Sequence, residues 1–130
     1  MRVLILCLMM IALVAVSGCA QTGEMEENAA EEIKGEKMNI TSGSLSYPAY
    51  LAAPGKEGVW PGVVMIHSFN GLEPGYLSLA DRLAEEGYVV IAPEWQSFNR
   101  TPSDETVGQL IQDCSALLQD RDDVQSDKLG

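Results

Sequence analysis

The sequence predicts an α/β domain in which parallel strands alternate with helices behind an exported amino terminus. Two apolar runs without polar alternation, residues 62–67 and 88–92, are typical of strands buried on both faces. Between and after these runs, apolar residues recur every three to four positions, as they do on one face of a helix. A strand, a helix and a strand joined by short links form a βαβ unit, so we expect parallel strands and a right-handed crossover.

The first 18 residues have the features of an export signal. Arg2 supplies a positive charge, and residues 3–16 form an uncharged apolar run that is too short to span a bilayer as a mature helix. Residues 16–19, Val-Ser-Gly-Cys, resemble the lipobox of bacterial-type lipoproteins. This resemblance implies that Cys19 is the lipid attachment site, and the alternative is an ordinary secretory signal that is cleaved nearby. We therefore expect an exported cell-envelope lipoprotein, anchored to the membrane on the extracytoplasmic side.

The charge balance limits the partners of the protein. The chain has 8 Lys and Arg against 19 Asp and Glu, a formal net charge of −11. Because phosphate binding needs clustered basic residues, we expect no nucleic acid partner, and no polybasic membrane patch. Residues 19–37 are rich in Glu and poor in large apolar side chains, which is typical of a flexible, solvated tether. The folded domain is expected at residues 38–130.

The first part of that domain is predicted to be an antiparallel hairpin. A weak strand at residues 38–41 precedes a turn at 42–43, and a second strand is expected at 45–52. The run at 62–67 follows and should be a central strand of the sheet.

The first helix is expected to begin at Pro74 and to stop at Gly87, since proline favours the first helical position and glycine favours the position after the last turn. The strand at 88–92 should end at Pro93. The apolar face of this helix consists of Leu77, Ala80, Leu83 and Ala84.

The second helix is predicted to have Thr101 as its N-cap, Pro102 at its first position and Asp104 reaching back to the cap. It should finish by Gln119, because aspartates follow that are unfavourable at the negative end of a helix. Residues 124–130 look like the approach to a third parallel strand, so the fold is expected to be incomplete at the C-terminus. The apolar stripe consists of Val107, Leu110, Ile111, Cys114, Leu117 and Leu118.

Several stretches carry a resemblance to a known family. They are Tyr-Leu-Ala at 50–52 with Pro54, Pro-Gly-Val-Val-Met-Ile-His at 61–67, Phe-Asn-Gly-Leu at 69–72 and Ala-Asp-Arg-Leu-Ala-Glu-Glu-Gly-Tyr-Val-Val-Ile-Ala-Pro at 80–93. The stretch from Tyr50 to Gly130 resembles the N-terminal half of the dienelactone hydrolase family in the α/β-hydrolase superfamily. The resemblance implies the N-terminal half of an α/β-hydrolase fold, a small-molecule ester or lactone substrate for the full-length protein, and no metal or organic cofactor.

The resemblance also implies which catalytic groups this chain lacks. The family has a Cys or Ser nucleophile on a Gly-x-Cys/Ser-x-Gly elbow, followed along the chain by an acid and a histidine. No such elbow occurs in the sequence, and residues 127–130 resemble the stretch that leads into it. The triad is therefore expected C-terminal to Gly130, and the chain alone is expected to be inactive. The alternative is a non-catalytic surface lipoprotein that acts as a binding or dimerisation module.

One functional element of the family falls within the chain. The loop after the first central strand supplies a backbone N–H to the oxyanion hole, which in this sequence would be that of Phe69, supported by Ser68, Asn70 and Gly71. The family commonly has Glu where this chain has Ser68, so a broader esterase-like hydrolase is equally compatible. His67 is expected to organise the loop rather than to act as a base, since adjacent residues on a strand end point apart and a Ser68–His67 dyad is geometrically poor.

The cysteines and the acidic cluster suggest no further chemistry. Cys7 belongs to the signal and Cys114 is left without a partner, so we expect no disulfide and a buried, inert Cys114. The aspartates at 120, 122 and 123 lack the turn glycine and distal glutamate of a calcium loop, so no metal site is expected.

Overall fold

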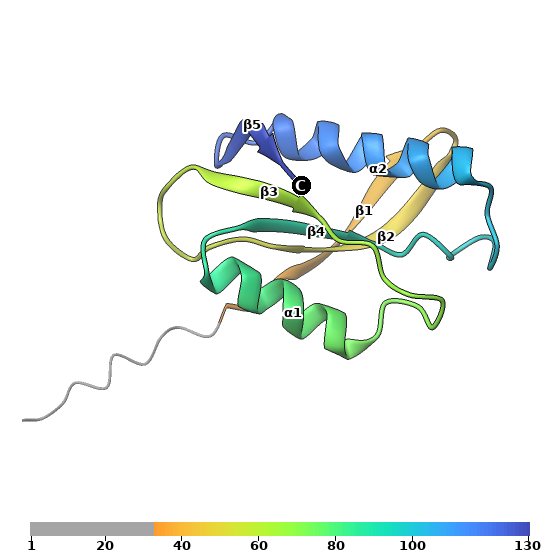
Figure 1. Ribbon diagram of the computed structural model, residues 1–130, viewed down its shortest axis with the longest axis horizontal. Coiled ribbons are helices and arrows are strands. Elements are labelled where there is room, and N and C mark those ends of the chain that lie inside the picture. The colour runs from red at the N-terminus through yellow and green to blue at the C-terminus, as the bar shows by residue number, and fades with distance from the viewer. Residues whose placement is uncertain (1–32) are drawn as a thin grey trace, which may run out of the picture.

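The computed structural model describes residues 33–130 as one mixed sheet with a helix packed on each face (Figure 1). Its strands are β1 (Glu36–Ser42), β2 (Leu45–Ala52), β3 (Trp60–Val64), β4 (Val89–Pro93) and β5 (Val124–Leu129), and its helices are α1 (Pro74–Glu85) and α2 (Asp104–Gln119). The strand order in the sheet is β1-β2-β4-β3-β5. The predicted signal, the lipid site Cys19 and the tether as far as residue 32 lie outside the described residues.

The predicted hairpin is confirmed, because β1 and β2 pair antiparallel through the whole length of β1. Gly43 has a φ of +59° in the turn, a conformation that glycine adopts without steric cost. β1 begins at Glu36 rather than at residue 38, so the last two residues of the expected tether belong to the sheet. The reason is that Glu36 and Lys37 are paired with Leu51 and Tyr50 of β2.

The βαβ unit is also confirmed, since β3 and β4 are parallel and α1 connects them. α1 begins at Pro74, and Gly87 follows it with a φ of +96°. β3 departs from the prediction, because the structure ends it at Val64 and leaves the following residues, as far as His67, in a loop. The backbone of this segment leaves the sheet after its first residue. The Met65 N–H still donates to Ile91 O of β4, but the carbonyl of His67 accepts a hydrogen bond from the Trp95 side chain.

The predicted cap of α2 is wrong by two residues. Ser103, not Thr101, is the N-cap, and its Oγ accepts the Thr106 N–H at 3.2 Å. Pro102 therefore precedes the cap, and Asp104 is the first helical residue. Serine and threonine are both good N-caps, so the position of Pro102 was not sufficient to predict which of the two residues beside it caps the helix. The end of the helix at Gln119 agrees with the prediction.

The last segment is itself a strand rather than the approach to one. β5 pairs parallel with β3, with an irregularity between Pro61 and Gly62. Two hydrogen bonds extend the pairing, from Gly130 N–H to Gly62 O at 3.0 Å and from Val64 N–H to Gly130 O at 2.8 Å. β3 thus has neighbours on both sides, as expected of an interior strand, while β5 forms one edge of the sheet.

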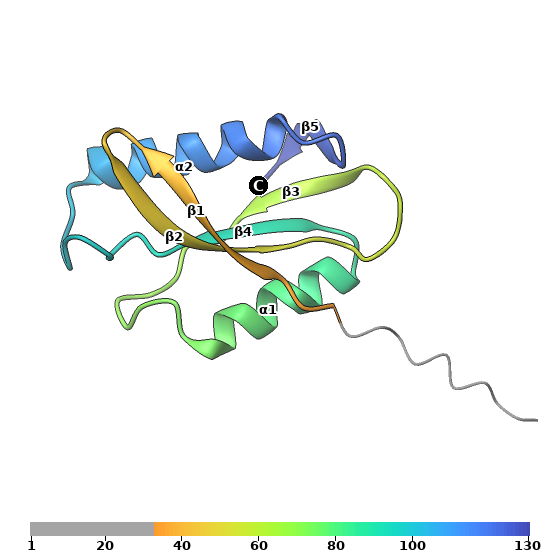
Figure 2. The same cartoon turned by 180° about the vertical axis from the view of Figure 1, so that it is seen from behind.

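Each helix covers its own hydrophobic cluster, and the two clusters lie on opposite faces of the sheet (Figure 2). On the α1 side, all the buried residues except Tyr50 are alanine or valine, and the helix packs on β4. Beneath α2 they are larger, and Cys114 is fully buried among them, as predicted. The buried residues of the α1 side are Tyr50, Ala52, Ala80, Ala84, Val90 and Ala92. Those of the α2 side are Ile40, Tyr47, Ala49, Leu51, Val89, Ile91, Leu110, Cys114, Leu118 and Val124. Neither helix within residues 33–130 is long and apolar enough to cross a membrane.

Candidate functional site

The candidate site is the β3–α1 loop, residues 65–73, at the carboxyl end of the parallel strands β3 and β4. Beside it runs the β4–α2 loop, residues 94–103. In α/β sheets, ligands bind outside the carboxyl ends of the strands. This is therefore the edge of the sheet where functional side chains are expected.

His67 holds the base of the β3–α1 loop. Its side chain is 3% exposed, and Nδ1 lies 2.7 Å from the carbonyl oxygen of Ser68. Because a carbonyl only accepts, Nδ1 carries the proton in this contact. Trp95 stacks on the imidazole at 5.4 Å and 24°, and its indole N–H donates to the His67 carbonyl at 3.0 Å. His67 therefore organises the loop, as the sequence indicates, and it contacts the carbonyl of Ser68 rather than its hydroxyl.

The loop turns tightly after His67. The Ser68 carbonyl also accepts the N–H of Gly71 at 3.1 Å, and Gly71 has a φ of +92°, which strongly favours glycine. The Gly71 carbonyl in turn accepts the Glu73 N–H at 3.0 Å. The N–H of Ser68 donates to the Tyr76 hydroxyl at 2.9 Å, which connects the loop to the first turn of α1. Both polar groups of the Ser68 backbone are thus held within the fold.

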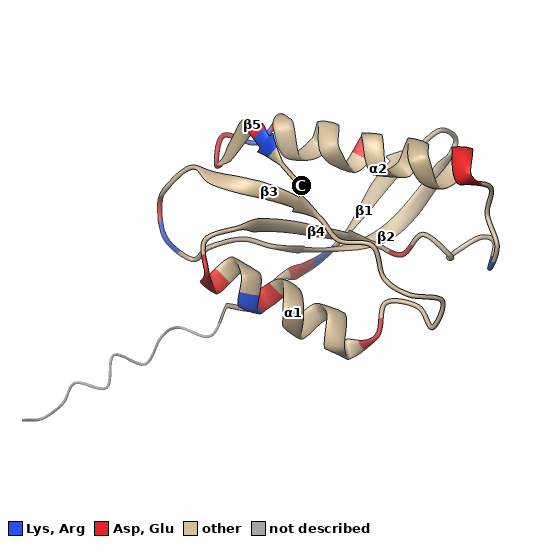
Figure 3. Ribbon diagram, in the orientation of Figure 1, with Lys and Arg blue, Asp and Glu red and all other residues tan. Residues whose placement is uncertain are grey.

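Phe69 differs from its neighbour Ser68 in this respect. The backbone N–H groups of Phe69 and Asn70 donate to no protein atom within residues 33–130. The Phe69 ring is 60% exposed and meets Trp95 edge to face at 5.9 Å. Figure 3 shows that no Lys, Arg, Asp or Glu lies on the loop before Glu73, its last residue. A short run of free N–H groups in an uncharged loop can donate to an oxyanion.

Cys114 and the aspartates after α2 lie away from this loop and have other roles. Burial, with a smaller effect of Asp113, raises the pKa of the Cys114 thiol to about 12, so Cys114 is not a thiolate nucleophile at neutral pH. Asp123 accepts hydrogen bonds from Nε and Nη2 of Arg121, both at 2.8 Å. Chiefly through this contact, Arg121 lowers the pKa of Asp123. In the described part of the chain, no three His, Cys, Asp or Glu side chains converge to hold a metal ion.

The sequence did not reveal how the loop is held. The hydrogen bonds from Trp95 to His67 and from Ser68 to Tyr76 join residues 28 and 8 positions apart. No periodicity or motif relates these positions. The sequence also did not indicate a groove beside the β1–β2 hairpin, which is described below.

The mixed sheet, the helix on each face and the free amides after β3 define the amino-terminal part of an α/β-hydrolase fold. Among solved structures with this fold, the chain is similar to a dienelactone hydrolase-like promiscuous phosphotriesterase from metagenomic libraries. The two align with a TM-score of 0.59 and 20% identity, over 75% of this chain and 47% of the other.

The family model described as the dienelactone hydrolase family matches residues 47–127, and the chain belongs to this family. The predicted family is therefore confirmed. The chain is 28% identical over 93 residues to protein usf of Aquifex pyrophilus, which covers 69% of this chain and 39% of that protein. It is 36% identical over 62 residues to a Synechocystis protein provisionally named carboxymethylenebutenolidase, which covers 48% of this chain and 25% of that protein. The chain thus spans less than half the length of these relatives.

Proposed function

We propose that this chain supplies the amino-terminal, oxyanion-stabilising part of an ester or lactone hydrolase and does not turn over substrate by itself. The observation that carries the proposal is the free N–H of Phe69, which directly follows a residue, Ser68, whose backbone N–H and carbonyl are both hydrogen-bonded. In acyl transfer, the nucleophile attacks the carbonyl carbon and an electron pair moves onto the carbonyl oxygen. An N–H that has no other acceptor can bind that oxygen without first breaking a hydrogen bond.

The proposal assigns the remaining catalytic groups to sequence C-terminal to Gly130 in the full-length protein. Two facts support this assignment. The chain contains no Gly-x-Cys/Ser-x-Gly elbow, and its match covers only 39% and 25% of the relatives described above. The edge strand β5 would then receive the next strand of the sheet, and a second N–H, from the residue after the nucleophile, would complete the oxyanion hole.

The substrate class follows from the family and from the loop. One relative is provisionally named a carboxymethylenebutenolidase, which acts on a lactone, and a neighbour in structure is named a phosphotriesterase. Ser68 places a neutral side chain beside the candidate donor. We propose a small, activated ester or lactone as substrate, with neither a metal nor an organic cofactor.

The purified chain tests the first half of the proposal. With p-nitrophenyl acetate and with a small lactone, we expect no hydrolysis above the buffer rate. Turnover that co-purifies with the chain and is abolished by a serine or cysteine reagent would contradict the proposed inactivity.

A chimera tests the second half. The chain would be fused after Gly130 to the C-terminal half of a dienelactone hydrolase, which supplies the triad. We expect an active chimera in which Phe69→Pro, which removes the N–H, lowers kcat by about 100-fold or more relative to Phe69→Ala, which keeps it. A folded chimera in which both variants have the same kcat would remove Phe69 from the oxyanion hole. A folded but inactive chimera would favour the non-catalytic module.

We further propose that the protein is lipidated at Cys19 and anchored to the outer face of a cell-envelope membrane. The lipobox-like residues 16–19 and the glutamate-rich stretch that follows support this proposal. Intact-mass spectrometry of the mature protein tests it: we expect an N-terminal Cys19 carrying diacylglycerol. An unmodified N-terminus at another residue would contradict it.

A further inference from the structure

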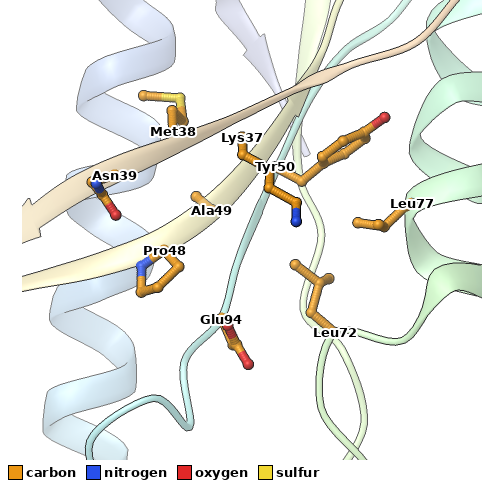
Figure 4. Close-up of a pocket in the computed structure, with 9 residues that line it drawn as sticks. All are labelled: Lys37, Met38, Asn39, Pro48, Ala49, Tyr50, Leu72, Leu77 and Glu94. Carbon is orange, nitrogen blue, oxygen red and sulfur yellow. The ribbon is translucent and has the colours of Figure 1, made fainter.

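A groove separate from the Phe69 amide lies between the β1–β2 hairpin and the start of α1 (Figure 4). Its volume is about 370 Å³, which is within the range of small-molecule binding sites. The hairpin contributes Lys37, Asn39 and Pro48, while Leu72 comes from the end of the β3–α1 loop and Leu77 from α1.

The pairing of the two strands explains why these side chains share one surface. Lys37 is paired with Tyr50, and Asn39 with Pro48. Since alternate residues of a strand point to the same face, these four side chains form the floor of the groove. The Tyr50 hydroxyl donates to Asp81 Oδ1 of α1 at 2.8 Å, so the floor is fixed to the helix.

Asp81 also fixes the residue that precedes β1. Its Oδ1 accepts a second hydrogen bond, from the Gly35 N–H at 2.9 Å, which places the start of β1 against α1. The groove is therefore bounded by an ordered strand, an ordered helix and the loop that carries Leu72.

The charged side chains of the groove, Lys37 and Glu94, indicate which ligands it favours. In Figure 4 the Lys37 side chain points toward Leu72 and Leu77, while the ring of Tyr50 points away from it toward α1. Within residues 33–130, Lys37 forms no ion pair, and neither does Glu94, which also lines the groove. A cation that faces apolar side chains without a carboxylate partner complements an anionic head on an apolar body.

We infer that this groove binds a small monocarboxylate with an unbranched apolar chain. The carboxylate lies at the Lys37 ammonium, and the chain lies along Leu72, Leu77 and Pro48. Glu94 disfavours a second carboxylate on the same ligand. This binding involves no covalent step, and it stands whether or not the hydrolase proposal holds.

Three eight-carbon probes test the inference by titration of the ¹⁵N-labelled chain, followed by amide chemical shifts. Octanoate is expected to shift the resonances of the groove residues. It should bind about fivefold more tightly than 1-octanol, because one partly exposed ion pair contributes at most about this factor to an affinity. Suberate, which carries a carboxylate at each end, is expected to bind more weakly than octanoate. Equal affinities for octanoate and octanol, or shifts confined to other parts of the chain, would overturn the inference.

Three variants separate the two charges from general effects on the fold. Lys37→Gln should reduce octanoate affinity to that of octanol, whereas Lys34→Gln, a change of an exposed lysine outside the groove, should leave it unchanged. Glu94→Gln should raise suberate affinity about twofold or more, a gain that loss of folding does not produce. If Lys34→Gln lowers the affinity for octanoate as much as Lys37→Gln does, the affinity depends on the net charge of the chain and the groove is not the binding site. An unchanged affinity for suberate in Glu94→Gln would remove Glu94 from the site.

Discussion

The β3–α1 loop and the β4–α2 loop both follow a parallel strand of the same sheet, yet they use their hydrogen-bond donors differently. In the β4–α2 loop beyond Trp95, several donors are satisfied locally: Thr101 N–H by Asn99, Ser97 N–H by Glu94, and the Gln96 amide by Arg100. In the β3–α1 loop, Tyr76 of α1 and Trp95 of the β4–α2 loop add hydrogen bonds from outside to those made within the loop, while the N–H groups of Phe69 and Asn70 donate to no protein atom within residues 33–130. A loop held in part by hydrogen bonds from other elements can leave its own backbone N–H groups free for a ligand.

The largest effect is expected from His67→Ala. The change removes a buried ring and one of the two hydrogen bonds to the Ser68 carbonyl, so we expect the free energy of unfolding to fall by about 2–3 kcal/mol. Urea unfolding measures this loss. Asn99→Ala in the β4–α2 loop is the matched control, because Asn99 is exposed, and its cost should stay below about 0.5 kcal/mol. Equal costs at the two sites would break the distinction between the loops.

Trp95→Phe should have the next largest effect. Phenylalanine keeps an aromatic ring against His67 but removes the indole N–H, which leaves the His67 carbonyl without its donor. We expect a loss of about 1–2 kcal/mol, measured by urea unfolding, together with faster amide exchange at Ser68. A stability loss without any change in the β3–α1 loop would show that Trp95 only packs.

Ser103→Ala tests a contact of the other loop. It removes the N-cap of α2, and we expect a loss of about 1 kcal/mol in thermal or urea unfolding. Because this cap is local, amide exchange at Ser68 and Phe69 should not change. Altered exchange there would mean that the cap of α2 also influences the β3–α1 loop.

Asp123→Asn should give the smallest effect, less than about 1 kcal/mol at neutral pH, because the pair with Arg121 is partly exposed. Arg121 lowers the pKa of Asp123 in the folded state, so the contribution is present above the pKa of Asp123 in the unfolded state. It is lost as pH falls through the folded value. Unfolding measured from pH 7 to pH 2 should therefore show a smaller loss on acidification in the variant. An identical pH dependence would exclude a role of this pair.

The sequence predicted those parts of the fold that are determined locally, by the spacing of apolar residues and by the residues that favour turns and helix ends. The hairpin, α1 between Pro74 and Gly87, and the end of α2 at Gln119 agree with the structure. The cap of α2 was misplaced because serine and threonine are both good caps and lie two residues apart.

The end of β3 was misplaced for a different reason. The apolar run continues to residue 67, but the hydrogen bonding to β4 ends at Met65, and His67 is held instead by a side-chain contact with the Ser68 carbonyl and by the indole N–H of Trp95. The same limit applies to the site. The loop and the role of His67 were predictable, whereas the contacts with Tyr76 and Trp95 depend on tertiary structure.

Amide hydrogen exchange at two consecutive residues tests the central claim most directly. The Ser68 N–H is held by Tyr76, while the Phe69 N–H has no acceptor in the described part of the chain. We predict that Ser68 exchanges at least about tenfold more slowly than Phe69, after correction for intrinsic rates. If Phe69 is protected as strongly as Ser68, its N–H is already engaged, and the β3–α1 loop does not present it to an oxyanion.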